Sequence, residues 1–387
     1  MNDDKYLKRV IIFAMRTIVK NKKTVFVAMS GGVDSSVAAL LLKRQGYGVV
    51  GVFMRCFNLD GCAERDAEDA RRVAEKLKIP FYVWDFEKEY KKKVVEYMVK
   101  GYKKGITPNP DVMCNREIKF GIFLKKALQM GADFVATGHY IKIQNSKFKI
   151  QNDNSKFKII YKLFQAKDKN KDQSYFLWAL IQAQLKHCLF PIGDYLKPKV
   201  REIARKAGLP TAEKKDSQGI CFLGKISLED FLKQYIPKKQ GDVLDVFGKK
   251  IGKHKGAHFY TIGQRHGLGI GGSEKPYYVV EKNVKKNIIV VAEGDDNSAL
   301  YKKRIELTDV NFINQQLLIN NQQQQVLMRV RYRQPLINAV LRQSALKSAS
   351  IRALFEKPQK AVAPGQSAVF YNKAGEMLGG GTIDKIL

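Results

Sequence analysis

The chain has 387 residues, too many for one ordinary hydrophobic core, so two or three domains are expected. Its hydrophobic fraction of 45% is typical of a globular protein, and it holds no run of the roughly 18 apolar residues that a transmembrane helix requires. Lys and Arg number 69 against 37 Asp and Glu; the net charge of +32 predicts salt-dependent binding to nucleic acid, although a lysine-rich proteome would also raise it.

The N-terminal segment, residues 1–23, is expected to be a basic helical extension. Its apolar stretch, Val10–Met15, is short, is followed by Arg16 and Lys20, and lacks a small-residue cleavage site, so a signal peptide is not indicated. The chain holds five cysteines, an odd and sparse set that argues against a secreted disulfide scaffold. These features favour a cytoplasmic protein that does not span a membrane.

Residues 24–140 alternate between short apolar runs and amphipathic stretches. The expected strands are 24–29, 48–53, 81–86 and 133–137, and the expected helices are 35–45, 64–77, 87–104 and 116–130. Because strands and helices of these lengths alternate, the sequence predicts an α/β domain with a doubly wound parallel sheet.

The second half of the chain begins with a repeat, in which Asn145–Ile150 (NSKFKI) recurs as Asn154–Ile159 and predicts a β-hairpin insertion. This hairpin is either a basic ribbon that touches nucleic acid or a tolerated surface insertion. Helices are expected at 172–185 and 197–207, but beyond Gly219 they give way to short β runs at 259–262, 277–280 and 288–291, with a linker near 282–286. The expected domains are 24–215, 216–284 and 285–387, after the extension 1–23.

A glycine-rich turn, Ser30–Ser36 (SGGVDSS), lies between the first expected strand and the first expected helix. Gly31 and Gly32 let the backbone approach an anion closely, and the helix start supplies N–H groups and a positive dipole end. Doubly wound sheets bind their ligands at this end of a strand. This anion site predicts a pyrophosphate group as the ligand, and a well-capped turn without a ligand is the alternative. The turn matches neither a Walker A nor a G-x-G-x-x-G loop.

The run SGGVDSS resembles the PP-loop of ATP pyrophosphatases, which cleave ATP to AMP and pyrophosphate and adenylate a substrate oxygen. The resemblance implies ATP and Mg²⁺, with a phosphate site made by Ala28, Met29, Ser30, Gly31, Gly32, Val33, Asp34 and Ser35. Met54 would lie against the adenine, although core packing explains it equally well, and Gly138 would let the nucleotide approach closely. Asp34 is a candidate Mg²⁺-linked residue, for which helix capping is an equal explanation.

Two cysteines lie in distinctive surroundings. Cys114 ends a proline-rich run (TPNPDVMC), in which Asp111 is expected to cap the next helix and to place Cys114 at the third helical position. The helix dipole favours a thiolate there, whereas Asp111 opposes it and could serve as a general acid or base. Cys221 lies in DSQGICF, where Gly219 suggests a mobile or tight loop at a domain junction. Either cysteine alone would more often be structural.

The segments TPNPDVMCNREIKF and DSQGICFLG resemble the two cysteine motifs of the tRNA-specific 2-thiouridylase family. Four more segments resemble this family in the same order: KDQSYFL (Lys171–Leu177), YTIGQRHGLGI (Tyr260–Ile270), RYRQP (Arg331–Pro335) and PGQSAVFY (Pro364–Tyr371). Together they span the chain from residue 24 to the C-terminus. The resemblance implies a PP-loop domain followed by two smaller β-rich domains, the last of them a β-barrel.

The same resemblance implies a mechanism. ATP would adenylate the oxygen on carbon-2 of a tRNA uridine, Cys221 would carry a persulfide received from a cysteine desulfurase or sulfur carrier protein, and Cys114 would attack that persulfide, leaving a Cys114–Cys221 disulfide. Alternatively, Asp111, Cys114 and Cys221 would hold an iron–sulfur cluster. Another PP-loop ligase or sulfurtransferase that adenylates a different substrate is the alternative function.

The residues that would contact tRNA also follow from the resemblance. They are Asn109, Pro110 and Asp111 at the target base, and Lys171, Asp172, Gln173, Arg331 and Tyr332 elsewhere. The target would be the wobble uridine of tRNAs for Lys, Glu and Gln, which is unpaired and can be flipped at low cost. No metal site is expected from Cys56 and Cys62, which lack further partners nearby; His139 is expected to pack near the nucleotide and Cys188 in the core.

Overall fold

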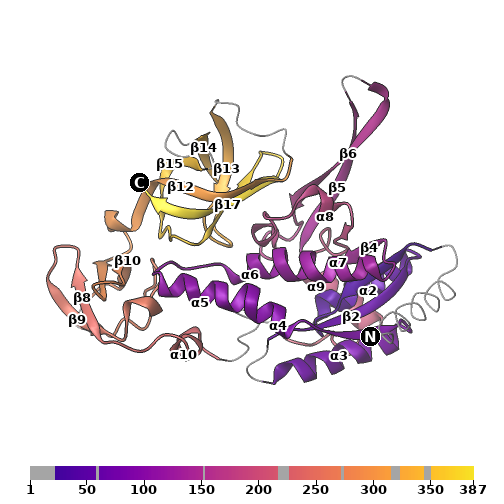
Figure 1. Ribbon diagram of the computed structural model, residues 1–387, viewed down its shortest axis with the longest axis horizontal. Coiled ribbons are helices and arrows are strands. Elements are labelled where there is room, and N and C mark those ends of the chain that lie inside the picture. The colour runs from indigo at the N-terminus through magenta and orange to yellow at the C-terminus, as the bar shows by residue number, and fades with distance from the viewer. Residues whose placement is uncertain are drawn as a thin grey trace, which may run out of the picture. The chain divides into compact units, whose positions relative to one another are not determined.

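The structure is a computed structural model that describes residues 22–57, 61–150, 153–216, 226–271, 274–314, 323–343 and 350–387. The chain divides into two compact units (Figure 1). The first unit comprises Met1–Lys93 and Asp111–Gly224, and the second comprises Val94–Pro110 and Lys225–Leu387. The chain therefore visits the second unit early and returns to the first between Pro110 and Asp111. Within the described ranges, no helix is long and apolar enough to cross a membrane.

A five-stranded parallel sheet forms the centre of the first unit. Its strands are β1 (Thr24–Ala28), β2 (Gly48–Arg55), β3 (Phe81–Asp85), β4 (Phe134–Ala136) and β7 (Cys188–Leu189). The strand order is β3-β2-β1-β4-β7, and all neighbours are parallel, which confirms the predicted doubly wound sheet. The order reverses at β1, between β2 and β4, and such a switch point is where these sheets bind ligands.

Helices and turns connect the strands of the first unit. The α-helices are α2 (Val33–Arg44), α3 (Cys62–Lys76), α4 (Glu87–Tyr90), α6 (Pro110–Met113), α7 (Leu124–Gln129), α8 (Gln182–Leu185) and α9 (Lys197–Lys206). Two π-helical stretches, η1 (Lys91–Val95) and η2 (Cys114–Phe123), and a 3₁₀ turn, η3 (Ser174–Phe176), complete the set. The helix predicted over 172–185 is wrong, because the Asp172 carboxylate accepts hydrogen bonds from the backbone of Ala166 and Ser174 and holds this stretch in a turn.

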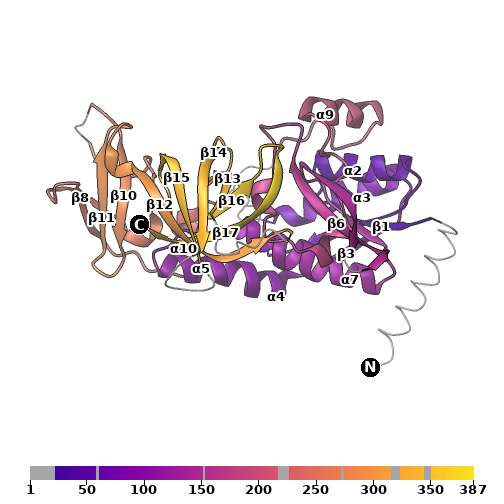
Figure 2. The same cartoon turned by 90° about the horizontal axis from the view of Figure 1, so that it is seen from above.

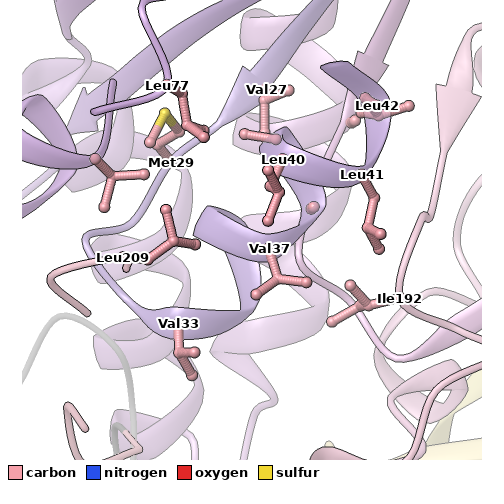
Figure 3. Close-up of a cluster of buried hydrophobic side chains, with 14 of the residues drawn as sticks. Val27, Met29, Val33, Val37, Leu40, Leu41, Leu42, Leu77, Ile192 and Leu209 are labelled. Atoms are coloured by element: carbon pink, nitrogen blue, oxygen red, sulfur yellow. The ribbon is translucent and has the colours of Figure 1, made fainter. Parts of the chain in front are cut away.

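The core of the first unit surrounds α2. Figure 3 shows side chains of α2, among them Val37 and Leu40, together with Leu77, Ile192 and Leu209 from other segments. Because α2 is apolar on most of its surface, it is enclosed by the sheet and by the segments around it. The glycine-rich turn at the start of α2 is therefore attached to a rigid element.

Strands β5 (Ile141–Ile150) and β6 (Asp153–Gln165) form the hairpin that the repeat predicts. They pair antiparallel, with Ile141 opposite Gln165, and run as a long two-stranded ribbon (Figure 1). The two copies of the repeat thus lie on opposite strands. A role of this ribbon in nucleic-acid binding stays a prediction.

The second unit begins with α5 (Glu96–Lys103), and its part after residue 225 holds α10 (Leu228–Lys233) and a four-stranded sheet of order β10-β11-β8-β9. The strands are β8 (Gly241–Asp245), β9 (Lys250–His254), β10 (Tyr277–Asn283) and β11 (Ile288–Glu293). The linker predicted at 282–286 is wrong, because Lys282 and Asn283 end β10 and residues 284–287 turn directly into its antiparallel partner β11. The β run predicted at 259–262 is also wrong, since a 3₁₀ turn, η4 (Ala257–Phe259), ends at its first residue and no strand follows over 260–262. Helix α10 was not expected; the Ser227 side chain caps its first turn by accepting from Asp230 N–H.

The C-terminal part of the second unit is a closed antiparallel barrel, as predicted (Figure 2). After a 3₁₀ turn, η5 (Ser298–Leu300), its strands are β12 (Tyr301–Phe312), β13 (Gln324–Arg329), β14 (Ile337–Gln343), β15 (Ile351–Lys360), β16 (Ser367–Tyr371) and β17 (Glu376–Ile386). The barrel closes because β12 pairs with both β15 and β17. Its interior is filled by apolar side chains such as Met328, Leu341 and Phe370.

Candidate active site

The glycine-rich turn between β1 and α2 is tightly constrained. Gly31 has φ +70°, and a Cβ on it would lie 2.3 Å from the carbonyl oxygen of Asp66, so only glycine fits. Ser35 Oγ accepts a hydrogen bond from Ser30 N–H at 3.1 Å, and Ser36 Oγ donates to the Gly32 carbonyl at 2.8 Å. The first-turn N–H groups of a helix have no intrahelical acceptor, so this rigid turn can cradle an anion.

Gly138, at the end of β4, lies directly against this turn. A Cβ on Gly138 would lie 2.6 Å from Ser35 N and 2.7 Å from the backbone carbon of Asp34. The absence of a side chain therefore lets the segment after β4 approach the first turn of α2. Contact of Gly138 with a nucleotide stays a prediction.

Three of the residues predicted to bind ATP lie in the hydrophobic core. Ala28, Met29 and Val33 are all buried, and Met29 N–H donates to the Val52 carbonyl at 2.8 Å. Met54, in contrast, is only partly buried at the carboxyl end of β2, where an adenine ring could reach it. The polar rim of the site is thus made by Ser30, Gly32, Asp34 and their neighbours in the turn.

Asp34 takes part in an ion pair that the sequence did not reveal. Both of its carboxylate oxygens lie 2.8 Å from Lys197 Nζ, and Oδ1 also accepts a hydrogen bond from the Tyr140 hydroxyl at 2.8 Å. Lys197 is only 8% exposed, and its backbone N–H donates to Asp168. A lysine at the first position of a helix opposes the dipole, and this unfavourable placement is the signal that could have identified Lys197.

Lys197 also contacts Asp216, the last described residue before the segment of Cys221. Asp216 lies within 2.8 Å of the side-chain nitrogens of Lys171, Lys197 and Arg201. Burial by itself would raise the pKa of Asp216, but the ammonium groups of Lys171 and Lys197 outweigh it and lower the pKa to about 2. Cys221, the predicted sulfur carrier, lies outside the described residues.

The KDQ segment, predicted to touch tRNA, makes its described contacts within the first unit. Asp172 is 2% exposed and accepts hydrogen bonds from Ser174 Oγ at 2.9 Å and from Ala166 N–H at 3.1 Å. Gln173 Oε1 accepts from Tyr140 N–H at 2.9 Å, next to the tyrosine that contacts Asp34. Gln173 therefore holds the backbone of Tyr140, whose hydroxyl contacts Asp34, and Asp172 fixes the turn that carries Gln173.

The helix of Cys114 begins earlier than expected. Pro110 is its first residue and Asp111 its second, so the prediction that Asp111 caps this helix is wrong; proline suits the first helical position because it has no N–H. Cys114 is 4% exposed and opens the π-helical stretch η2, a form often found at functional sites. Burial raises the pKa of Asp111, which the Lys119 ammonium partly offsets.

Asn115, beside Cys114, is a site residue that the sequence alone did not single out. Its Nδ2 donates to the Phe176 carbonyl at 3.1 Å, whereas its buried Oδ1 accepts no hydrogen bond from the described residues. Nearby in the same unit, His139 packs against Phe120 and Phe190, and burial lowers its pKa well below the usual value. The imidazole is therefore neutral at pH 7 and cannot supply a cation to the site.

The remaining cysteines show no metal cluster. Among the residues that the structure describes, no group of three or more His, Cys, Asp and Glu side chains could hold a metal ion. Cys56 and Cys188 form no disulfide with any cysteine that the structure describes, and burial raises the pKa of Cys188, which fits the predicted core position. An iron–sulfur cluster on Asp111, Cys114 and Cys221 would need a ligand outside the described ranges.

Apart from Asp111, which lies in the first unit, the other residues predicted to touch tRNA belong to the second unit. Asn109 in the loop before α6 and Pro110 at the first position of α6 are both buried. Arg331 Nη2 donates to the Ile262 carbonyl at 2.7 Å, and the Arg333 guanidinium lies 5.1 Å from the centre of the Tyr332 ring. A contact of Arg331 or Tyr332 with tRNA stays a prediction.

Comparison with known proteins matches the chain in three consecutive parts. Residues 23–225 match the model of a tRNA methyl transferase HUP domain, residues 229–293 that of a tRNA methyl transferase PRC-barrel domain, and residues 302–383 that of an aminomethyltransferase β-barrel domain. The tRNA-specific 2-thiouridylase MnmA of Bacillus licheniformis is 47% identical over 369 residues, which cover 94% of this chain and 95% of that relative. The protein of the same name from Bacillus subtilis is 45% identical with the same coverage.

Proposed function

The chain belongs to the tRNA-specific 2-thiouridylase family, and on this basis we propose which of its residues carries out each part of the reaction. It is a sulfurtransferase that uses ATP to thiolate tRNA uridine at carbon-2. The observation that carries the assignment is identity of 47% across 94% of the chain, together with the constrained SGGVDSS turn at the switch point of the sheet. Methyl transfer, named in the descriptions of two matched models, is not favoured, because a pyrophosphate-binding turn serves adenylation.

The turn Ser30–Ser35 binds the ATP phosphates, and the uridine oxygen attacks the α-phosphate. This attack forms an O–P bond to the uracil carbon-2 oxygen and releases pyrophosphate. The carbonyl oxygen, a poor leaving group, thereby becomes part of AMP, which departs when sulfur attacks carbon-2. The helix dipole and the N–H groups at the start of α2 stabilise the negative charge that collects on the phosphates.

Lys197 exchanges a carboxylate for phosphate during this reaction. Without nucleotide its ammonium group bridges Asp34 and Asp216 at 2.8 Å. A triphosphate at the turn offers Lys197 an anion of higher charge, which would leave the Asp34 carboxylate available to help hold Mg²⁺, whose charge would offset that of the phosphates. The fit of Mg²⁺ rests on oxygen ligands, which Asp34 and the phosphates supply.

Cys221 and Cys114 divide the sulfur chemistry. Cys221 carries a persulfide from a donor protein, and its terminal sulfur forms the bond to carbon-2 as AMP leaves. Cys114 then attacks the Cys221 sulfur, so that the S–S bond of the persulfide breaks and a Cys114–Cys221 disulfide remains, which an external thiol must reduce before the next cycle. A cluster held by Asp111, Cys114 and Cys221 is the competing arrangement.

The substrate is the wobble uridine of tRNAs for Lys, Glu and Gln in the cytoplasm. The net charge of +32 supports binding to the RNA backbone, and a single-stranded loop base can be flipped at low cost. Asn109, Pro110 and Asp111 contact the flipped base in this proposal. Lys171 and Arg331 are the cations of the predicted tRNA set.

The test is mass spectrometry of tRNA nucleosides after incubation with the protein, ATP, Mg²⁺ and a persulfide source, with Cys221→Ser in parallel. We expect 2-thiouridine with the wild type and none with Cys221→Ser. An equally active variant would refute the relay, would also count against a cluster that needs Cys221 as a ligand, and would favour direct attack of free sulfide on carbon-2. If ATP is cleaved and neither protein makes 2-thiouridine, the substrate assignment fails.

A further inference from the structure

The loop before Cys114 is held by segments of the second unit to which the proposed reaction gives no role. Thr107 N–H donates to the Pro364 carbonyl at 2.8 Å, and Gln366 Nε2 donates to the carbonyls of Thr107 at 2.9 Å and Pro108 at 3.4 Å. All these residues belong to the second unit. The PGQ segment of the barrel thus binds both the N–H and the carbonyl of a single loop residue.

Gly365 makes this contact sterically specific. It has φ +90°, and a Cβ on it would lie 2.8 Å from Thr107 O, 2.9 Å from Thr107 C and 3.1 Å from Thr107 N. Any larger residue would push the loop away from the barrel and would also be strained at this φ. The segment Pro364–Gln366 therefore packs closely against the backbone of Thr107.

The YTIGQ segment holds the other side of the loop. Thr107 Oγ1 lies 3.3 Å from Thr261 Oγ1, and Thr261 also hydrogen-bonds the buried Tyr102 hydroxyl on α5. Next to Thr261, the Ile262 carbonyl accepts the 2.7 Å hydrogen bond from Arg331 of the RYRQP segment. Two segments that are far apart in sequence thus meet at this loop, and Arg331 of a third segment holds one of them.

The loop needs such external support because its own backbone offers little. Pro108 and Pro110 have no N–H, so two of the four residues of the loop cannot donate a backbone hydrogen bond. Pro110 is also the first residue of α6, so the position of the loop determines where that helix starts. Asp111 and Cys114 follow within the same continuous helix.

We propose that Gln366, with Gly365 and Thr261, forms a positioning clamp that fixes the Thr107–Pro110 loop and thereby the place of Asn109 and Pro110, which contact the target base in the proposed function. The clamp rests on the proposed function for its catalytic meaning, since only that function places the target base at Asn109 and Pro110. Gln366 touches no reacting atom and acts through the backbone of the loop.

Gln366→Glu tests the clamp, because the carboxylate keeps the shape of the amide but turns its donor into an acceptor facing two carbonyl oxygens. Gln359→Glu is the matched control: Gln359 Nε2 also donates to two consecutive carbonyls, those of Lys357 at 2.8 Å and Pro358 at 3.3 Å, within β15 and away from the loop. For Gln366→Glu we expect the turnover rate of uridine thiolation to fall about 10- to 100-fold, with the KM for ATP and the Tm close to those of the control.

Hydrogen exchange of the Thr107 amide is a second measurement that does not depend on activity. The clamp predicts at least about tenfold faster exchange in Gln366→Glu and in Thr261→Val than in the wild type, and no change in Gln359→Glu. If the wild type makes no 2-thiouridine, the proposed function fails while this measurement still tests the clamp.

Two results would overturn the proposal. One is exchange at Thr107 that the substitutions leave unchanged, which would show that no clamp exists. The other is faster exchange with a thiolation rate within about twofold of the control, which would show that the clamp does not position the target base. If Gln366→Glu does not fold, Thr261→Val decides the question in its place.

Discussion

Replacing Lys197 by Met is the sharpest test of the ion-pair network beside the phosphate turn. The side chain keeps its length but loses the ammonium group, which leaves Asp34 without its 2.8 Å cation and Asp216 with only Lys171 and Arg201. Breaking a buried pair costs about 3–5 kcal/mol and an exposed pair about 0–1 kcal/mol. The Lys197 side chain is 10% exposed, but those of Asp34 and Asp216 are 32% and 27% exposed, so we expect the free energy of unfolding to fall by about 1–3 kcal/mol.

The effect of Lys197→Met on catalysis should exceed its effect on stability. A charge-assisted contact to phosphate contributes about 1.5–3 kcal/mol, so the kcat/KM for ATP in pyrophosphate release should fall by about 10- to 100-fold. Lys233→Met is the control, since Lys233 bridges Glu229 at 2.9 Å and Asp230 at 2.6 Å in the second unit. A Lys197→Met protein that is less stable but keeps its kcat/KM for ATP within about twofold would show that Lys197 is structural only.

Two further predictions follow from the same site. Gly138→Ala would place a Cβ 2.6 Å from Ser35 N, so the rate of pyrophosphate release should fall at least about tenfold. The control is Gly271→Ala, whose Cβ would meet nothing within 4 Å, and its rate should match that of the wild type. Equal activity of the two variants would contradict the importance of the Gly138 contact. The pKa of Asp216 is lowered to about 2, so its ion pairs stabilise the fold above the unfolded value of about 3.8 and are lost as the pH falls toward 2. The stability difference between wild type and Asp216→Asn, measured by urea unfolding, should therefore be about 1–2 kcal/mol at pH 7 and vanish near pH 2; a difference independent of pH would refute this reasoning.

Periodic and local features were predictable from the sequence. The apolar runs of β1 and β2, the glycine turn and the repeat of the β5–β6 hairpin all depend on near neighbours in the chain, so their patterns are visible without a structure. The errors arose where side chains decide the backbone. Asp172 turns the predicted 172–185 helix into a loop, and Pro110 starts its helix one position before Asp111 can cap it.

Long-range partners could not be found from the sequence. Lys197 and Asp34 are 163 positions apart, and no spacing rule connects a lysine at a helix start with an aspartate in a phosphate turn. The contacts of Thr107 with Gln366 and Thr261 are equally non-local, separated by 259 and 154 positions. Only the fold brings such residues together. A sequence motif also does not show whether a given residue binds the ligand itself or positions another residue that binds it.

The hydrogen bonds of the KDQ segment help to separate those two roles. For Asp172 to reach tRNA, its carboxylate would have to leave the donors of Ala166 and Ser174 in a buried position, and each donor left unpaired costs about 1–3 kcal/mol. Lys171, with a side chain 31% exposed, can exchange Asp216 for a phosphate of RNA at far lower cost, because one anion replaces another. That exchange would leave Asp216 with two of its three cations, Lys197 and Arg201. Asp216 comes directly before the segment that carries Cys221. We therefore expect Lys171 to be the member of the segment that contacts tRNA, while Asp172 and Gln173 hold the backbone next to it.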